Sequence, residues 1–326
     1  MNAKKVIIDC DPGIDDTLAL MLALSSPELD VLGITVVSGN VPVEKGAENA
    51  LKVLDWMNRK DIPVYLGEPL PLVRNYVDAM DTHGDDGLGE SNYPTITDIR
   101  PHTDAVGFLR DTLLHTPHVS VVALGPLTNL ARLYQTSPEA FAQIEEMVSM
   151  GGNYKSHGNC SPVAEYNYWC DPDAAHIVYE AFSSMEGKLL HMIGLDVTRQ
   201  IVLTPDILQY MRYANPVMGE RITNITKFYL DFHWKQEGII GCVINDPLAV
   251  AYFIDRNLCQ GFASYTAVET QGISIGQTLV DTYHFWNKPD NSYILTQTDA
   301  YGFMKFFLQR VINAPVTEIE RILKTN

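Results

Sequence analysis

Four aspartates lie within eight residues near the start of the chain. Asp9 lies near the end of the largely apolar run Lys5–Cys10, and Asp11, Asp15 and Asp16 follow it around a Pro-Gly turn. Carboxylates this close repel one another unless a proton or a cation lies among them, and Ca²⁺ prefers several oxygen ligands. The spacing therefore predicts a metal-binding or catalytic site. A simpler interpretation stays open for each residue alone, in which Asp15 and Asp16 complement a helix dipole and Asp11 caps a turn.

An EF-hand calcium loop does not fit this cluster. Such a loop needs an acidic or amide side chain at its fifth position and Glu at its twelfth. Counted from Asp9, those positions hold Gly13 and Leu20. The cluster therefore needs another explanation.

The aspartate-nucleophile phosphatases of the haloacid dehalogenase type offer an alternative. They begin with a strand followed by D-x-D, which Asp9 and Asp11 match. Their next signature position usually carries Thr or Val, where this chain has Gly13. Their later acidic pair should follow an apolar strand, but Asp85 and Asp86 follow the segment AMDTHG. We keep this function as the weaker alternative.

Strand-like and helix-like segments alternate along the chain, as in βαβ units. Strands are expected at Lys5–Cys10, Val31–Val37, Ile62–Leu66, Val119–Leu124, Met147–Met150 and Lys188–Ile193, and helices at Asp15–Leu24, Val43–Asn58, Asp104–His115, from Leu127, at Val217–Glu237 and at Asp246–Ile254. Less regular strands are expected at Phe262–Val268 and Ile275–Asp281. The pattern predicts one α/β domain over residues 1–326, with a mainly parallel, Rossmann-like central sheet flanked by helices. The acidic cluster then lies at the carboxyl end of the first strand, where such sheets bind ligands.

Composition excludes several classes of partner. Lys plus Arg total 23 against 40 Asp plus Glu, a net charge of −17 in 326 residues. This charge repels phosphate backbones and anionic lipid, so no nucleic acid and no membrane partner is expected. The five cysteines share no CxxC spacing, which argues against a zinc site or a disulfide framework. A cytoplasmic location is expected, because neither a signal-peptide core nor an apolar run of ~20 residues occurs.

Seven motifs spread over nearly the whole chain resemble the inosine–uridine-preferring nucleoside hydrolases, and they occur in that family's order. They are VIIDCDPGIDD at the N-terminus, SGN at 38–40, THGDDGLG at 82–89, ALGPLTNLA at 123–131, MGGN at 150–153, PVAEYNYWCDPDAA at 162–175 and NDPLAVA at 245–251. The resemblance implies the nucleoside hydrolase fold. It also implies hydrolysis of the N-glycosidic bond of a ribonucleoside to ribose and free base, in nucleoside catabolism or salvage.

The resemblance implies one tightly held Ca²⁺ as the cofactor and a ribonucleoside as the partner. Cleavage of a sugar–base bond needs an activated water, stabilisation of an oxocarbenium-like sugar and help for the departing base. Calcium can orient a water and lower its pKa, while a ligating carboxylate takes the proton. The family also implies a homo-oligomer, either a tetramer or a dimer.

Residue by residue, the resemblance assigns the metal site. Asp11 is expected on the metal and as the base toward the attacking water. Asp16, Asp246 and the backbone carbonyl of Leu124 are expected as further metal ligands. Asp15 falls where the family binds the ribose 2′-hydroxyl.

The resemblance places Asn40, Asn159, Glu165 and Asn167 at ribose-contacting positions, with Met150 packing nearby. Asn is also an ordinary turn residue, so a purely structural role stays open for Asn159. Glu165 and Asn167 lie among apolar neighbours in PVAEYNYW. Burial there requires polar partners such as sugar hydroxyls.

The chain departs from the family at the leaving-group side. Many members carry His directly before the metal-binding Asp of the C-terminal motif, where this chain has Asn245. Asn can donate a hydrogen bond but cannot deliver a proton, so leaving-group activation must differ or the preferred base must need less of it. Tyr229 and His233 are four residues apart and share one helical face. We predict that they face the base, the alternative being a surface His233 with Trp234 packed on the core.

His83 lies in a glycine-rich loop that could close over the site, with a solvated loop histidine as the alternative. Asp85 and Asp86 are expected to shape this loop. A third functional hypothesis is a catalytically silent nucleoside-binding protein. The intact Asp11 and Asp246 argue against it, because binding alone needs no base beside a metal. Purine or pyrimidine preference is left open by the sequence.

Overall fold

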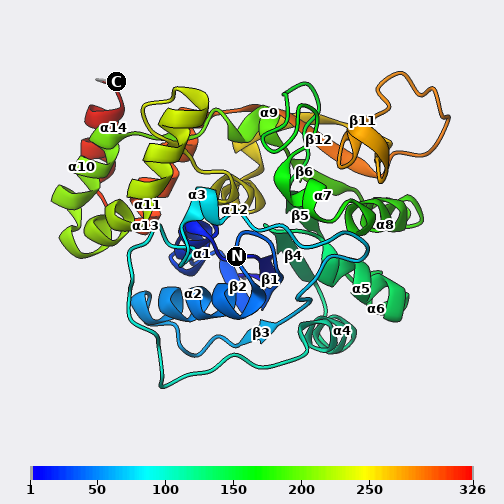
Figure 1. Ribbon diagram of the computed structural model, residues 1–326, viewed down its shortest axis with the longest axis horizontal. Helices are drawn as coiled ribbons and strands as arrows, with labels where there is room; N and C mark the ends of the chain where they lie inside the picture. Colours follow the sequence, from blue (N-terminus) through cyan, green and yellow to red (C-terminus); the bar gives the residue numbers. More distant parts are fainter. Residues whose placement is uncertain (1–2, 325–326) are drawn as a thin grey trace.

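The computed structural model describes residues 3–324, which form an eight-stranded sheet with helices packed on both faces (Figure 1). The strands of this sheet are β1 (Lys4–Cys10), β2 (Leu29–Val36), β3 (Val64–Leu66), β4 (Val119–Ala123), β5 (Met147–Met150), β6 (Leu190–Ile193), β9 (Cys259–Ser264) and β12 (Ser292–Thr298). Two short antiparallel pairs lie outside it, namely β7 (Val202–Leu203) with β8 (Cys242–Val243), and β10 (Thr266–Val268) with β11 (Thr278–Val280).

The helices fall between the strands and after the last of them. They are α1 (Ile14–Leu24), α2 (Val43–Trp56), α3 (Met80–His83), α4 (Ala105–His115), α5 (Thr128–Thr136), α6 (Pro138–Phe141), α7 (Tyr166–Cys170), α8 (Pro172–Ser183), α9 (Leu195–Thr198), α10 (Pro205–Ala214), α11 (Pro216–Glu237), α12 (Asp246–Ile254), α13 (Ala300–Val311) and α14 (Val316–Lys324). Within residues 3–324, no helix combines the length and apolar character needed to cross a bilayer.

The strand order of the sheet locates a ligand-binding edge. The order is β3-β2-β1-β4-β5-β6-β12-β9, and neighbouring strands are parallel except for the pair β12 and β9. Winding therefore reverses between β1 and β4, and doubly wound sheets bind ligands at the carboxyl ends of the strands at this point. Asp9 of β1 pairs with Ala123 of β4. Asp11 and Leu124, which follow these strands, consequently lie at the same edge of the sheet.

The sheet separates two apolar cores. Side chains of β1 alternate between them, because successive residues of a strand point to opposite faces. Val6 and Ile8 join a core formed with α1, α2, α12 and α13, whereas Ile7 joins a core formed with α4, α5 and α8. Figure 1 shows α1 and α2 on one side of the strands and α5, α6 and α8 on the other. A sheet covered in this way holds the ends of β1 and β4 in fixed positions.

The predicted fold class is confirmed, and the main differences lie in the C-terminal half. The segment expected as one strand at Phe262–Val268 is divided, because β9 belongs to the large sheet and β10 to the separate pair with β11. The expected strand Ile275–Asp281 contains only the three residues of β11. The sequence analysis did not predict β12, which lies between β6 and β9, nor the helix α8.

Candidate active site

A cavity of about 580 Å³ opens at the carboxyl edge of the sheet. Among residues 3–324, its wall includes every site residue expected from the sequence except Asp11 and Asp16. The expected residues that line it are Asp15, Asn40, His83, Leu124, Met150, Asn159, Glu165, Asn167, Tyr229, His233, Asn245 and Asp246. Segments far apart in the chain therefore meet at one site, as the family resemblance implied.

The turn between β1 and α1 is fixed by Asp16. Its carboxylate accepts hydrogen bonds from the backbone N–H groups of Asp11 and Gly13, each at 3.1 Å. This arrangement caps the first turn of α1, which has no other side chain at its start to do so. The side-chain amide of Asn40 also donates to Asp16, at 3.0 Å. Asp16 thus organises the turn, a task that the simpler interpretation gave to Asp11.

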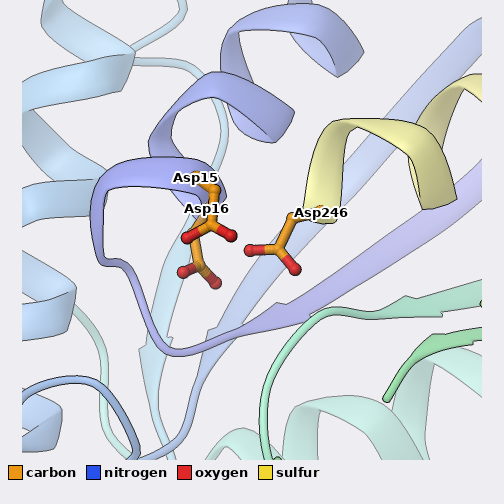
Figure 2. A group of neighbouring side chains, drawn as sticks. All are labelled: Asp15, Asp16 and Asp246. Carbon is orange, nitrogen blue, oxygen red and sulfur yellow. The ribbon is translucent and has the colours of Figure 1, made fainter. Parts of the chain in front are cut away.

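Three carboxylates converge at the base of the cavity. Figure 2 shows Asp15 and Asp16 from the first turn of α1 facing Asp246, the first residue of α12. One oxygen from each lies within 4.8 Å of the others, and all three residues are buried. Because Ca²⁺–oxygen distances are about 2.4 Å, one cation can reach oxygens separated by this distance. The donor set fits a hard divalent cation.

Asp11 lies beside this group in a space that only glycine neighbours permit. A Cβ atom on Gly39 would lie 2.0 Å from Asp11 Oδ2, and one on Gly125 would lie 2.5 Å from Oδ1. Oδ2 accepts the backbone N–H of Asn40 at 2.7 Å, whereas the buried Oδ1 has no hydrogen-bond partner in the part of the chain that the structure describes. An oxygen left in this state is available to a cation or to a proton.

Burial and mutual repulsion act on all of these carboxylates. Burial, followed by the charges of neighbouring aspartates, raises the pKa of Asp11 and of Asp246 well above the usual range. The same causes raise the pKa of Asp16 to about 7. A divalent cation in their midst would reverse the effect by favouring the ionised forms. The cluster is therefore better suited to holding a cation than to standing alone.

The fourth aspartate of the acidic run takes no part in the cluster. The carboxylate of Asp9 accepts the Thr35 hydroxyl at 2.5 Å and the Asn129 amide at 2.7 Å beneath the site. These bonds tie β1 to β2 and to α5. Asp9 thus supports the strand ends that carry the cluster.

The opposite wall of the cavity comes from β4, β5 and α7. The side-chain amide of Asn167 donates to the carbonyl of Leu124 at 2.7 Å and to the carbonyl of Met150 at 3.2 Å. The carboxylate of Glu165 accepts backbone N–H groups of Gly152, Asn167 and Tyr168. Burial nevertheless raises the pKa of Glu165 to about 7. The polar partners expected for the buried side chains of Glu165 and Asn167 are therefore, at least in part, backbone groups of the protein.

Asn245 points its donors at Asp15. Its backbone and side-chain N–H groups both bond to Asp15 Oδ2, at 3.3 and 3.1 Å, and the Tyr229 hydroxyl approaches the same oxygen at 3.4 Å. The buried Oδ1 of Asn245 finds no partner within residues 3–324. Asn245 was expected as a catalytic residue that can donate a hydrogen bond, and in the structure its side-chain N–H bonds to Asp15 Oδ2.

The two histidines of the cavity hold their protons differently. The backbone N–H of Ile14 donates to His83 Nδ1 at 3.0 Å, which assigns the imidazole proton to Nε2. His233 Nδ1 lies 2.9 Å from the carbonyl of Tyr229, so this nitrogen carries the proton and Nε2 is free to accept. Burial lowers the pKa of both imidazoles. His233 is buried and Trp234 is 60% exposed, the reverse of the surface-helix alternative.

Some of the loop residues line the cavity, and others hold the loop in shape. His83 ends the short helix α3 and is buried rather than solvated. Asp86 accepts three backbone N–H groups of its own loop, from Leu88, Glu90 and Asn92, as expected for a residue that shapes the loop. Asn159 is exposed at the rim of the cavity.

Several lining residues were missed by the sequence analysis. Tyr166 lies between Glu165 and Asn167 in the motif EYNYW, and its position beside them was the available signal. Arg199 also lines the cavity, where it donates to the carbonyl of Gly158 at 3.1 Å. No motif marks Arg199, because its contacts depend on the folding of a distant loop.

Comparisons with known proteins agree with this arrangement. A family model described as inosine-uridine preferring nucleoside hydrolase matches residues 6–305. The chain is 36% identical over 313 residues to the pyrimidine-specific ribonucleoside hydrolase RihA of Escherichia coli O81 strain ED1a, covering 95% of this chain and 98% of the relative. The same protein of Salmonella arizonae matches equally, at 36%.

Solved structures give the same result for the fold. A plant nucleoside hydrolase, PpNRh1, superposes with a TM-score of 0.86 at 32% identity, covering 96% of this chain and 99% of that one. A purine-preferring ribonucleoside hydrolase from Gardnerella vaginalis gives a TM-score of 0.86 at 31% identity, covering 99% and 100%. The chain therefore belongs to the inosine-uridine preferring nucleoside hydrolase family, a family of N-glycosidic bond hydrolases.

Proposed function

We propose that the protein hydrolyses the N-glycosidic bond of ribonucleosides to ribose and free base in a calcium-dependent reaction. The observation that carries the proposal is the group of buried carboxylates, Asp15, Asp16 and Asp246, at the base of a cavity large enough for a small ligand. Family membership supports the reaction, and the oxygen-only donor set supports the ion.

Asp11 is the proposed general base. Its Oδ1 has no partner in the described chain, and its Oδ2 is fixed by the Asn40 N–H, so one oxygen is oriented and the other is free. A base must have an available lone pair at a defined position, and Oδ1 meets that requirement. Asp11 would take the proton of the attacking water as the C1′–nitrogen bond breaks.

Asp16, Asp246 and the carbonyl of Leu124 are proposed to hold the ion together with Asp11. Asp15 belongs to the same carboxylate group, and its Oδ2 already faces Tyr229 and Asn245. We therefore propose that Asp15 acts mainly on the ribose 2′-hydroxyl. When bound, Ca²⁺ supplies positive charge that orients a water and makes it easier to deprotonate.

The sugar is proposed to bind between the α1 turn and α7. Asn40, Glu165 and Asn167 line this part of the cavity and Asn159 lies at its rim, while Met150 gives an apolar surface for the ring. The negative charge of Asp15 and Glu165 would stabilise positive charge that develops on the sugar as the base departs. Binding and charge stabilisation thus come from the same wall.

The departing base is proposed to lie against Tyr229 and His233. Their ring centroids are 4.4 Å apart with an interplanar angle of 73°, and the centroid of the His83 ring lies 5.3 Å from that of Tyr229. Because His233 Nε2 is the nitrogen without the assigned proton, it must first be protonated before it can act as an acid. His83 Nε2–H can donate a hydrogen bond as a neutral group.

Release of reducing sugar from a panel of nucleosides, with and without a chelator, tests the proposal. An active calcium-dependent enzyme releases ribose only when calcium is present. A silent binding protein would release none while still binding nucleosides, and a phosphatase would release phosphate from phosphate esters instead. Either of these outcomes would overturn the proposal.

The same panel addresses base preference. The relatives named above include a pyrimidine-specific enzyme at 36% identity and a purine-preferring one at 31%. Both inosine and uridine therefore belong in the panel. We also propose a homo-oligomer, a tetramer or a dimer, which light scattering of the purified protein tests. The exposed side chains of Tyr283 and Phe285, 81% and 83% accessible, are consistent with such an assembly.

A further inference from the structure

One peptide group contacts Asp11 and two tyrosines at its opposite ends. The peptide joins Gly39 to Asn40, and its N–H donates to Asp11 Oδ2 at 2.7 Å. The carbonyl of the same peptide, on Gly39, lies 3.0 Å from the hydroxyl of Tyr76 and 2.9 Å from that of Tyr166. In a trans peptide the C=O and N–H point in opposite directions. The tyrosines therefore lie behind the peptide and Asp11 in front of it.

The Gly39–Asn40 peptide packs closely against the carboxylate of Asp11. A Cβ on Gly39 would overlap Asp11 Oδ2, at 2.0 Å. A small rotation of the peptide would thus either break the 2.7 Å hydrogen bond or push the carboxylate toward Gly125. The position of Oδ1, the oxygen left for chemistry, consequently depends on how firmly the Gly39 carbonyl is held.

We propose that Tyr76 and Tyr166 are positioning residues that set the Asp11 carboxylate through the Gly39–Asn40 peptide. Hydrogen bonds to the carbonyl restrict rotation of the peptide and polarise it, which strengthens donation from its N–H. The inference rests on the proposed function for the role of Asp11 as a base. It adds two residues whose hydroxyls donate to backbone carbonyls rather than to the carboxylates of the site.

Either tyrosine hydroxyl, that of Tyr76 or that of Tyr166, can donate a hydrogen bond to the carbonyl of Gly39. A phenol has one proton to donate, and the Tyr166 hydroxyl lies within reach of two acceptors, the carbonyl of Gly39 and that of Val77 at 3.0 Å. When Tyr76 serves Gly39, Tyr166 can serve Val77. When Tyr76 is lost, Tyr166 can turn to Gly39. Removal of one hydroxyl should therefore have less effect than removal of both.

The arrangement links three distant segments. Tyr76 comes from the connection between β3 and α3, Tyr166 begins α7, and Gly39 follows β2. The segment that contains Tyr76 continues into α3, which carries His83. The carbonyl of Gly39 thus connects the segment before α3, the start of α7 and, through its peptide, the proposed base Asp11.

The test compares Tyr76→Phe, Tyr166→Phe and the double variant in the calcium-loaded full-length protein. Tyr179→Phe is the matched control, because it removes a buried hydroxyl whose hydrogen-bond partner within residues 3–324 is the Tyr168 hydroxyl, in the core that contains α5 and α8. We expect kcat on inosine or uridine to fall less than ~3-fold in each single variant and ~10-fold or more in the double variant, the size of one lost hydrogen bond in the transition state. KM should change less than kcat, because both rings remain in place.

Two further measurements do not depend on turnover. Hydrogen exchange at the Asn40 amide should be faster in the double variant than in the wild type or Tyr179→Phe. Calcium affinity by calorimetry should fall ~5-fold or more, because Asp11 loses its fixed position.

The outcomes separate this inference from the proposed function. Faster exchange at Asn40 with no nucleosidase activity in any variant would support the positioning role and reject the hydrolase role. A double variant that matches Tyr179→Phe in kcat, Asn40 exchange and calcium affinity would overturn the inference. Equal losses in kcat and stability for the double variant and the control would also overturn it, by showing a general packing effect.

Discussion

Asn245 gives both its backbone and its side-chain N–H to a single oxygen of Asp15, at 3.3 and 3.1 Å. A carboxylate oxygen can only accept, so this pair fixes which end of the Asn245 amide faces Asp15. The residue that stands where many family members carry histidine therefore orients a carboxylate. We propose that leaving-group assistance comes from elsewhere in the cavity.

Asn245→Ala tests this relationship. The substitution removes the side-chain donor and leaves only the backbone N–H on Asp15 Oδ2, so Asp15, which we propose binds the ribose 2′-hydroxyl, should be held less firmly. KM for ribonucleosides should rise ~10-fold, about the value of one charge-assisted hydrogen bond. Turnover of 2′-deoxynucleosides, which lack that hydroxyl, should change far less. Equal effects on ribo- and deoxyribonucleosides would show that Asn245 acts outside the 2′-hydroxyl contact.

Asp11→Asn tests the base. The substitution keeps the size but removes the charge and the proton acceptor, so kcat should fall by at least ~10²-fold at saturating calcium. Asp231→Asn, on the exposed side of α11, is the matched control and should have no effect. A variant within a factor of ten of wild type would remove Asp11 from this role.

His233→Ala tests assistance to the departing base. Natural nucleosides should slow by ~10²-fold, whereas p-nitrophenyl riboside, which already has a good leaving group, should change little. Trp234→Ala is the neighbouring control, because Trp234 is exposed. Equal losses on both substrates would instead indicate a packing role for His233.

The pH dependence of the His233 effect follows from its burial. Burial lowers the pKa of His233 below its usual 6.5, so the acid form is present at low pH and is lost as pH rises through the lowered value. The ratio of wild-type to His233→Ala rates on inosine or uridine should therefore be largest on the acid side of pH 6.5 and decline toward neutrality. A ratio that increases with pH would contradict a role as an acid.

Calcium should also stabilise the fold. An ion that binds only the native cluster adds about 2.7 kcal/mol at 100 times its dissociation constant. Thermal unfolding followed in calcium and in chelator should show a higher midpoint with calcium, and Asp16→Asn should lose most of this difference. Identical midpoints for the wild type under both conditions would argue against a tight site.

The sequence predicted the parts of this protein that depend on local pattern. The run VIIDC is apolar except for Asp9 because β1 is buried, and Asp11, Asp15 and Asp16 follow it because the strand ends there. Two motifs more than two hundred residues apart meet in the cluster of Asp15, Asp16 and Asp246, which only the family resemblance anticipated.

Contacts between loops that are distant in the chain could not be predicted from the sequence. The direction of the Asn245 amide depends on where Asp15 lies after folding, and the bonds from Tyr76 and Tyr166 to Gly39 join three segments. β12 was missed because its apolar run, Tyr293–Leu295, is only three residues long and is followed by polar residues. Each case is decided by a partner that is remote in the chain.

The most direct test measures ribose release from inosine and uridine by protein shown by elemental analysis to be metal-free, and then again after calcium is restored. The account predicts no release above the uncatalysed rate without metal and full recovery with calcium. It also predicts no recovery in Asp16→Asn or Asp246→Asn at the calcium concentration that restores the wild type. Full activity in the metal-free protein would contradict the central claim.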